Sequence, residues 1–315
     1  MSINQLVLFV DSTMYNTLGL FFVTYGVLVS IRFLSYPDLT PDGSFTIAAC
    51  LFARLVDEGL PEYQALLASL AAGVSCGFTT VFLNEKVRIG KLLSSVIVMI
   101  IAVASAPYIL GRATIGLLDK QLMLNQLEAI DRKLSNLLFG SSIEGISHPV
   151  SIGLGLVTAG VLAVCLALLS KTRWGVAVRY LGSSLNSAPV VGQSTAKYKF
   201  AGVLLGNGLV AVGGVIEATR RASADQGMGL GIVLTGVAAL IIGESFVRWF
   251  RGVIVLSPSQ EMVSVVIGVI GYSLIVQSVL FFGSTTIDVR LLSAILLTVI
   301  LGISHRFVGR TSDLF

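Results

Sequence analysis

Polar residues that could do chemistry are few in this chain, and they gather where apolar sequence is interrupted. Four lie beside two prolines, one stands alone inside an apolar run, and four follow that run. The three groups are Asp38, Thr40, Asp42 and Ser44; then Asn207; then Glu217, Arg220, Arg221 and Asp225. Polar groups in apolar surroundings are costly. Each group therefore either lines a polar route or is satisfied internally, by helix capping, an interhelical hydrogen bond or an interfacial charge cluster.

The residue patterns of enzymes and of nucleotide-binding proteins are missing from the sequence. The one Gly-Lys pair, Gly90-Lys91, is followed by Leu92 and lacks the spacing of a phosphate-binding loop. His148 and His305 are expected at opposite faces of the protein, so they cannot share a site. The three cysteines lie in separate apolar runs and predict neither a disulfide framework nor a metal site: Cys50, Cys76 and Cys165. We therefore expect no enzymatic activity and no cofactor.

The composition is that of an integral membrane protein. The chain is 55% hydrophobic and 12% charged, whereas soluble domains carry about 25% charged residues. Uncharged runs long enough to span a bilayer recur along it: Ser12–Ile31, Tyr63–Asn84, Leu92–Leu110, Val150–Ser170 and Met262–Ile287. The net charge of +4 is then a property of the loops and does not indicate nucleic-acid binding. We expect an all-α, multi-pass protein in contact with membrane lipid.

Nine crossings are predicted, and the second is too short to cross as one straight helix. Their expected ranges are 16–34, 43–56, 64–84, 89–110, 150–170, 200–217, 228–246, 261–282 and 289–304. Pro37, Pro41 and Gly43 precede the short crossing and predict a broken helix there. Irregular backbone at membrane depth is tolerated only beside protein or a water-filled cavity. Glu244 and Arg248 are expected to pair along one helix.

The distribution of Lys and Arg predicts the orientation. Twelve of the 21 basic residues fall in loops on one face, which we assign to the cytoplasm. This places the N-terminus outside and the C-terminus inside. The loop 171–199 carries five basic residues and no acidic one, and we expect another protein to bind it from the cytoplasm. The long external segment, 111–149, contains an expected amphipathic helix, Asp119–Leu138, which either caps the bundle or docks an external partner.

Three segments resemble one family of transport proteins. The stretch from Arg179 to Gly192 resembles the cytoplasmic coupling segment of ABC importer permeases, in the class for branched-chain amino acids, ribose and uncharacterised solutes. Residues 37–45 resemble the broken-helix segment of these permeases, and residues 227–245 resemble their second discontinuous segment. Ser184 and Leu185 stand where the family usually has Asn-Pro. Pro189 falls within the expected short helix, so that helix is expected to end by Ala188 or to restart at Pro189.

The resemblance implies a single transmembrane permease domain over residues 1–315, with about nine helices in two inverted repeats whose breaks lie at 38–44 and 225–231. It implies a substrate pathway between the repeats and a coupling site for a separate ATPase. The expected pathway residues are Asp38, Thr40, Asp42, Gly43, Ser44, Phe45 and Asn207. The expected coupling residues are Arg179, Gly182, Ser183, Ser184, Leu185, Ala188, Val190, Val191 and Gly192.

The function expected from the resemblance is that of the membrane subunit of an ABC importer in a bacterial inner membrane. Its partners would be an ATPase that binds ATP on the cytoplasmic side, an extracytoplasmic solute-binding protein, and a second permease in a homodimer or heterodimer. The substrate would be a small polar solute, with an amino acid as one class. The alternative is a secondary transporter or channel without an ATPase, which has no need of the segment Arg179–Gly192.

Overall fold

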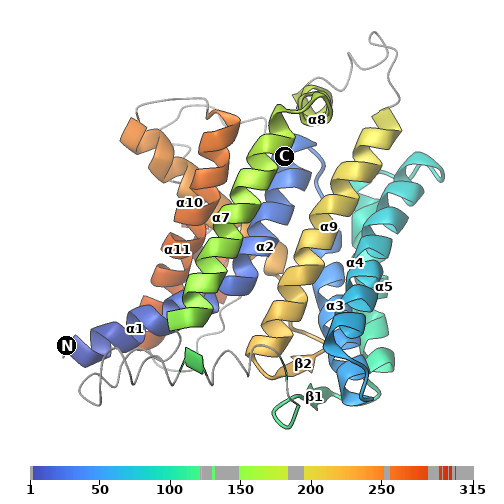
Figure 1. The fold of residues 1–315 in the computed structure, drawn as a ribbon. Coiled ribbons are helices and arrows are strands. Elements are labelled where there is room, and N and C mark those ends of the chain that lie inside the picture. Colours follow the sequence, from blue (N-terminus) through green and yellow to red (C-terminus); the bar gives the residue numbers. More distant parts are fainter. Residues whose placement is uncertain are drawn as a thin grey trace. The chain divides into compact units, whose positions relative to one another are not determined.

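The computed structural model describes residues 3–120, 122, 130–131, 149–183, 195–251 and 256–282, with 291–292, 294–296, 298–299 and 302. These residues are mostly helical (Figure 1). The long helices are α1 (Ile3–Asn16), α2 (Leu18–Val27), α3 (Thr40–Asp57), α4 (Glu62–Glu85), α5 (Lys91–Leu110), α7 (Pro149–Lys171), α9 (Thr195–Arg220), α10 (Ile232–Arg251) and α11 (Pro258–Phe282). Shorter elements are the π-helix η1 (Leu28–Phe33), helix α8 (Arg173–Ser183), and strands β1 (Thr114–Gly116) and β2 (Ser223–Asp225).

Six of the described helices are long and apolar enough to cross a membrane, which makes the chain a multi-pass membrane protein. They are α4, α5, α7, α9, α10 and α11. A seventh span results if α1 is counted together with α2 and η1, to which it is joined by a 42° bend. The predicted short second crossing is α3, which is not among the six. The predicted ninth crossing lies largely outside the described residues, so the count of nine and the inverted repeats stay predictions.

The contacts divide the chain into two units. Unit 1 comprises Met1–Phe21, Gln121–Val164 and Val237–Phe315, and in it α1 packs against α11. The rings of Phe9 and Phe281 meet there edge to face, with centroids 5.7 Å apart. Unit 2 comprises Phe22–Lys120 and Cys165–Gly236. It holds both predicted breaks, so the rest of the description concentrates on it.

Helix α3 is the centre of unit 2, where it packs against α4, α5 and α9, while α4 also packs against α9 (Figure 1). Glycines allow the closest approaches. A Cβ atom on Gly26 would lie only 2.5 Å from the carbonyl oxygen of Gly206, and one on Gly206 would lie 2.6 Å from Ser30 Oγ. Gly206 therefore allows α9 to approach α2 and η1 closely.

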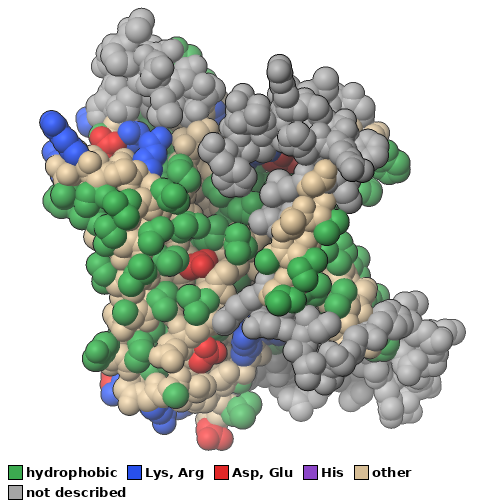
Figure 2. Space-filling model, turned by 180° about the vertical axis from the view of Figure 1, so that it is seen from behind, with side chains coloured by type: hydrophobic (Ala, Val, Ile, Leu, Met, Phe, Trp, Pro, Cys, Tyr) green, Lys and Arg blue, Asp and Glu red, His purple; other side chains and the backbone are tan. Residues whose placement is uncertain are grey.

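The outer surface of unit 2 separates apolar from charged side chains. Figure 2 shows hydrophobic side chains over much of its middle and Lys and Arg side chains at its two ends. Exposed Leu67, Phe78, Ile100 and Ile101 contribute to the apolar surface on α4 and α5. Exposed aliphatic and aromatic side chains on spanning helices are expected to face lipid.

The described residues agree with the predicted all-α class, with one addition: β1 and β2 form a short two-stranded antiparallel sheet. Thr114 pairs with Asp225 and Gly116 pairs with Ser223. This sheet ties the segment after α5 to the segment after α9. Three-residue strands are too short to show an alternating apolar pattern, which is why the sequence did not indicate them.

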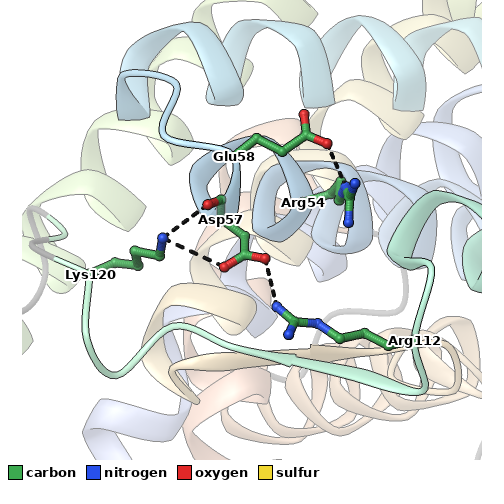
Figure 3. Close-up of polar contacts among 5 residues, drawn as sticks. All are labelled: Arg54, Asp57, Glu58, Arg112 and Lys120. Carbon is green, nitrogen blue, oxygen red and sulfur yellow. Dashed lines mark hydrogen bonds and ion pairs between the residues drawn. The ribbon is translucent and has the colours of Figure 1, made fainter.

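Ion pairs also hold the segment that follows α5, residues 111–120, to the end of α3 (Figure 3). Arg112 Nη2 lies 2.6 Å from Asp57 Oδ2, and Lys120 Nζ lies 3.5 Å from Asp57 Oδ1. Lys120 Nζ also donates a 3.0 Å hydrogen bond to the Asp57 carbonyl oxygen, while Arg54 pairs with Glu58 at 2.7 Å. Exposed pairs of this kind contribute about 1 kcal/mol or less each. The predicted amphipathic helix, Asp119–Leu138, lies mainly outside the described residues.

Candidate functional site

The first break lies slightly earlier in the chain than we predicted from Pro37 and Pro41. The π-helix η1 ends at Phe33 and α3 begins at Thr40, so the irregular segment is 34–39. Pro41 lies in the first turn of α3, where its missing N–H would have no partner in the helix anyway. The predicted start at Gly43 was therefore too late. Asp42, Gly43 and Ser44 lie within α3 instead of forming the break.

Asp38 links the irregular segment 34–39 to the helices α3 and α9. Its side chain is only 2% exposed, yet both carboxylate oxygens are used. Oδ1 accepts a 2.9 Å hydrogen bond from the Thr40 backbone N–H, and Oδ2 accepts one of 2.9 Å from Asn207 Nδ2. The first bond satisfies a backbone donor at the start of α3, where no helical partner exists. The second joins the break to the middle of α9.

Asn207 is fully buried and is the centre of this polar network. Its Nδ2 donates to Asp38 and to the Val203 carbonyl oxygen (3.0 Å), and its Oδ1 accepts a 2.6 Å hydrogen bond from Ser44 Oγ. Room for the amide comes from α4, because a Cβ atom on Gly77 would lie only 3.1 Å from Asn207 Nδ2. The interhelical hydrogen bond that the sequence offered as one interpretation of Asn207 is thus confirmed.

A second polar contact links α3 to α4. Thr40 Oγ1 and Thr80 Oγ1 lie 2.7 Å apart, and both side chains are fully buried. Together with the Asp38–Asn207–Ser44 contacts, this hydrogen bond means that polar side chains join α3, α4 and α9 at one level of the bundle.

The second break connects α9 to α10. The chain leaves α9 at Arg220, passes through β2 and a turn, and starts α10 at Ile232, four residues after the predicted start of the seventh crossing. Asp225 Oδ1 accepts a 2.8 Å hydrogen bond from the Gly227 N–H within the turn. Gly231 has a φ of +80°, a conformation that glycine adopts without strain.

Asp42 connects the two breaks directly. Its carboxylate accepts 2.8 Å hydrogen bonds from the backbone N–H groups of Gly231 and Val233, at the start of α10. The prediction that Asp42 caps a helix is therefore confirmed, but the helix is α10 and not its own. A carboxylate at a helix N-terminus also interacts favourably with the helix dipole. The two segments that the sequence marked as breaks, 189 residues apart along the chain, thus meet through one side chain.

Gly229 lies where α3 and the second break come closest. A Cβ atom at this position would overlap Thr46 Oγ1 and the Asp42 carbonyl oxygen. Thr46 Oγ1 in turn donates a 2.8 Å hydrogen bond to that carbonyl oxygen. The close approach therefore requires glycine at position 229, and it keeps Asp42 within reach of α10.

The remaining charged groups form structural pairs. Glu217 lies 2.6 Å from both Arg220 and Arg221, which favours the interfacial charge cluster over a pathway role for this group. Glu244 and Arg248 pair at 3.0 Å along α10, as predicted. Among the residues that the structure describes, no cluster of His, Cys, Asp and Glu could hold a metal ion.

The seven predicted pathway residues are all buried in unit 2, and most belong to the polar network or its immediate surroundings. Gly43 does not belong to the polar network and instead packs closely against α5. A Cβ atom at this position would lie 2.8 Å from Ala102 Cβ. Phe45 packs its backbone against α9 at Gly214. The polar atoms of the network satisfy one another, an arrangement that holds the breaks in place. Contact of these residues with substrate stays a prediction.

The predicted coupling residues are only partly described. Arg179, Gly182 and Ser183 belong to α8, which ends at Ser183. The others lie outside the described residues: Ser184, Leu185, Ala188, Val190, Val191 and Gly192. Helix α8 packs against α9 and η1, and the guanidinium carbon of Arg179 lies 4.2 Å from the centroid of the Phe33 ring. Sequence reasoning had missed Phe33 and Thr80, which carry no pattern of their own in the apolar sequence.

Comparison with known proteins places this arrangement in a family. The family described as branched-chain amino acid transport system, permease component, matches residues 10–303. The chain belongs to this permease family. Its members are membrane subunits of ABC-type import systems for amino acids and sugars, and they are not themselves enzymes.

Individual relatives are distant but extend over most of the chain. A tyrosine transport system permease protein of Clostridioides difficile is 24% identical over 286 residues, which cover 91% of this chain and 88% of the relative. The uncharacterized protein RP368 of Rickettsia prowazekii is 26% identical over 86% of this chain and 89% of its own. The fructose import permease protein FruG of Bifidobacterium longum is 24% identical over 67% of this chain and 59% of its own. No solved structure matches the chain.

Proposed function

We propose that this permease works in a bacterial inner membrane as part of a complex with a separate ATPase and an extracytoplasmic solute-binding protein. Two permease subunits, identical or homologous, would enclose the pathway. The proposal rests above all on the family match over residues 10–303. Hydrolysis of ATP by the partner would drive solute across the membrane, and the buried network around Asn207 would hold the broken helices beside the route.

The proposed substrate is a small polar solute, with an amino acid as the first class to test. The family description names branched-chain amino acids and one relative is a tyrosine transport permease, whereas another is a fructose import permease. The polar atoms of the buried network, on Asp38, Ser44 and Asn207, bind one another and leave no evident set of groups for a particular solute. Recognition would then fall mainly to the solute-binding protein, whose bound ligand identifies the substrate.

The proposed ATPase site is the basic segment from α8 to Gly192. Apolar side chains buried in a partner's pocket often contribute about 2 kcal/mol or more each. The double substitution Val190→Asp and Val191→Asp should therefore release the ATPase in a co-purification experiment while the permease still inserts in the membrane. Val87→Asp is the matched control, because Val87 is 53% exposed and lies in another loop of the same predicted face. Retention of the ATPase by the double variant would contradict this site.

The proposed orientation places this face in the cytoplasm. Lys199 Nζ lies 2.6 Å from Glu85 Oε1, so the start of α9 and the end of α4 share one end of unit 2. Leu118, which is 82% exposed, follows β1 at the ends of α3 and α9. In a variant with Cys165→Ala, a cysteine replacing Leu118 should react with an impermeant thiol reagent from outside. A cysteine replacing Arg173 should react only after the membrane is opened, and the reverse pattern would refute the orientation.

A further inference from the structure

Helix α8 has two distinct faces. Val178 is fully buried and Arg179 beside it is half-buried, whereas Val176 and Tyr180 are 57% and 46% exposed. Residues three and four apart lie on the same side of a helix, so Val176, Tyr180 and the exposed Arg173 share an outer face. Val178 lies on the opposite side of the helix, and Arg179, which lies between the two sides, reaches the Phe33 ring of η1. Helix α8 as a whole packs against α9 and η1. The arginine of the coupling segment therefore points into its own chain, while the outer face is open to a partner.

The inward contact of Arg179 is made to an aromatic ring. Its guanidinium carbon lies 4.2 Å from the centroid of Phe33, whose side chain is only 5% exposed. A guanidinium within about 6 Å of a ring centroid is attracted to the ring, and the attraction strengthens where water is excluded. This contact holds α8 to the last residue of the π-helix η1.

Phe33 is followed immediately by the first break. The backbone continues from η1 through hydrogen bonds from Leu34 N to Val29 O (3.3 Å) and from Tyr36 N to Ser30 O (3.0 Å). Asp38 comes next and is bonded to Asn207. A displacement of α8 that moves Phe33 would act on this short segment, because hydrogen bonds connect it continuously to η1. Single π-helical turns inside helices are frequently found at functional sites.

We propose that Arg179 is a positioning residue that transmits motion of α8 to the first break through Phe33, and not a residue that holds the ATPase. The proposal rests on the proposed function, since it assumes that an ATPase moves α8. In this arrangement the outer face of α8, with Val176 and Tyr180, faces the partner. Arg179 conveys the displacement to η1, to Asp38 and so to the network around Asn207.

The test uses the complex of the permease with the ATPase that co-purifies with it, and it needs no knowledge of the substrate. Hydrogen exchange of peptides covering residues 34–44 is compared without nucleotide and with ATP plus orthovanadate. Arg179→Met should leave the amount of bound ATPase unchanged but reduce the nucleotide-dependent difference in exchange about fivefold, the effect expected for loss of a partly desolvated cation–π contact. Phe33→Leu, which keeps an apolar side chain at this position, should do the same.

The conservative variants Arg179→Lys and Phe33→Tyr keep a cation and a ring, so they should retain most of the nucleotide response. Arg88→Met, at an exposed position in the loop between α4 and α5, is the matched control and should behave as the unsubstituted chain. A merely structural role would change exchange equally with and without nucleotide. A normal response in Arg179→Met, or loss of bound ATPase in that variant, would overturn the inference alone. Failure of the unsubstituted chain to bind any ATPase would overturn the proposed function as well.

Discussion

Replacing Asp42 with alanine removes the cap that α3 supplies to α10. The carboxylate accepts 2.8 Å hydrogen bonds from Gly231 and Val233, and both N–H groups belong to the start of a helix, where no helical partner exists. Their loss leaves two donors in a largely buried place. The variant Asp42→Asn keeps one acceptor oxygen and loses the charge, so it should show about half of the effect.

The size of the effect follows from the two bonds and the charge. Polar contacts between membrane helices contribute about 0.6 kcal/mol on average and about 1.7 kcal/mol at most. Hydrogen bonds to a charged group lie at the upper end of the range, and a carboxylate at a helix N-terminus adds about 0.5–1 kcal/mol. We therefore expect Asp42→Ala to reduce the free energy of unfolding by about 3 kcal/mol, and Asp42→Asn by about 1.5 kcal/mol.

The assay is thermal unfolding in detergent, followed with a thiol-reactive dye. Cys50 and Cys76 are buried and react only on unfolding, whereas the exposed Cys165 is first replaced by alanine. A loss of about 3 kcal/mol should lower the unfolding midpoint by about 6 °C or more.

Asp57→Asn is the matched control on the same helix. Asp57 pairs with Arg112 and Lys120 at a partly exposed position, where its side chain is 28% exposed. Loss of these two pairs should cost at most about 2 kcal/mol in all. If Asp42→Ala lowers the midpoint no more than Asp57→Asn does, the carboxylate does not hold the two breaks together and the reasoning fails.

Two further predictions concern the same region. In a double-mutant cycle, Ser44→Ala and Asn207→Ala should be non-additive by about 1 kcal/mol in the free energy of unfolding, because Ser44 Oγ donates to Asn207 Oδ1; additive effects would contradict a direct bond. Gly229→Ala should lower both the unfolding midpoint and transport, because its methyl group would overlap Thr46 and Asp42. Gly160→Ala, in α7 with open space around it, should be neutral or should stabilise the helix by up to about 1 kcal/mol; equal losses in both variants would refute the packing argument.

Much of the architecture could be predicted because hydropathy and chain breakers are local properties. The spans of α4, α5, α7 and α11 follow from uncharged runs, and the first break follows from its prolines. The predicted starts of α3 and α10 were wrong by three or four residues for the same reason, because local sequence alone does not fix where a helix begins. Pro41 both ends one segment and fits the first turn of the next, so the sequence alone could not assign it to either.

The contacts within the site could not be predicted in the same way. Asp42 and Asn207 stood out as polar residues in apolar surroundings, but their partners are far away in the sequence. The bond from Asn207 to Ser44 spans 163 residues, and the bonds that cap α10 span 189 and 191. Only the packing of α3 against α9 and the second break decides which polar group meets which. Partners such as Thr80 are ordinary helix residues whose role depends on that packing.

The most direct test of the account is uptake by proteoliposomes that contain the permease, the ATPase that co-purifies with it, and the solute-binding protein with its identified ligand. We predict that uptake requires ATP on the side of the membrane that carries the ATPase and the binding protein on the opposite side. Uptake should be lost when the ATPase is left out. Uptake that proceeds in liposomes with the permease alone, driven by an ion gradient or by the solute gradient itself, would contradict the account and establish a secondary transporter or channel instead.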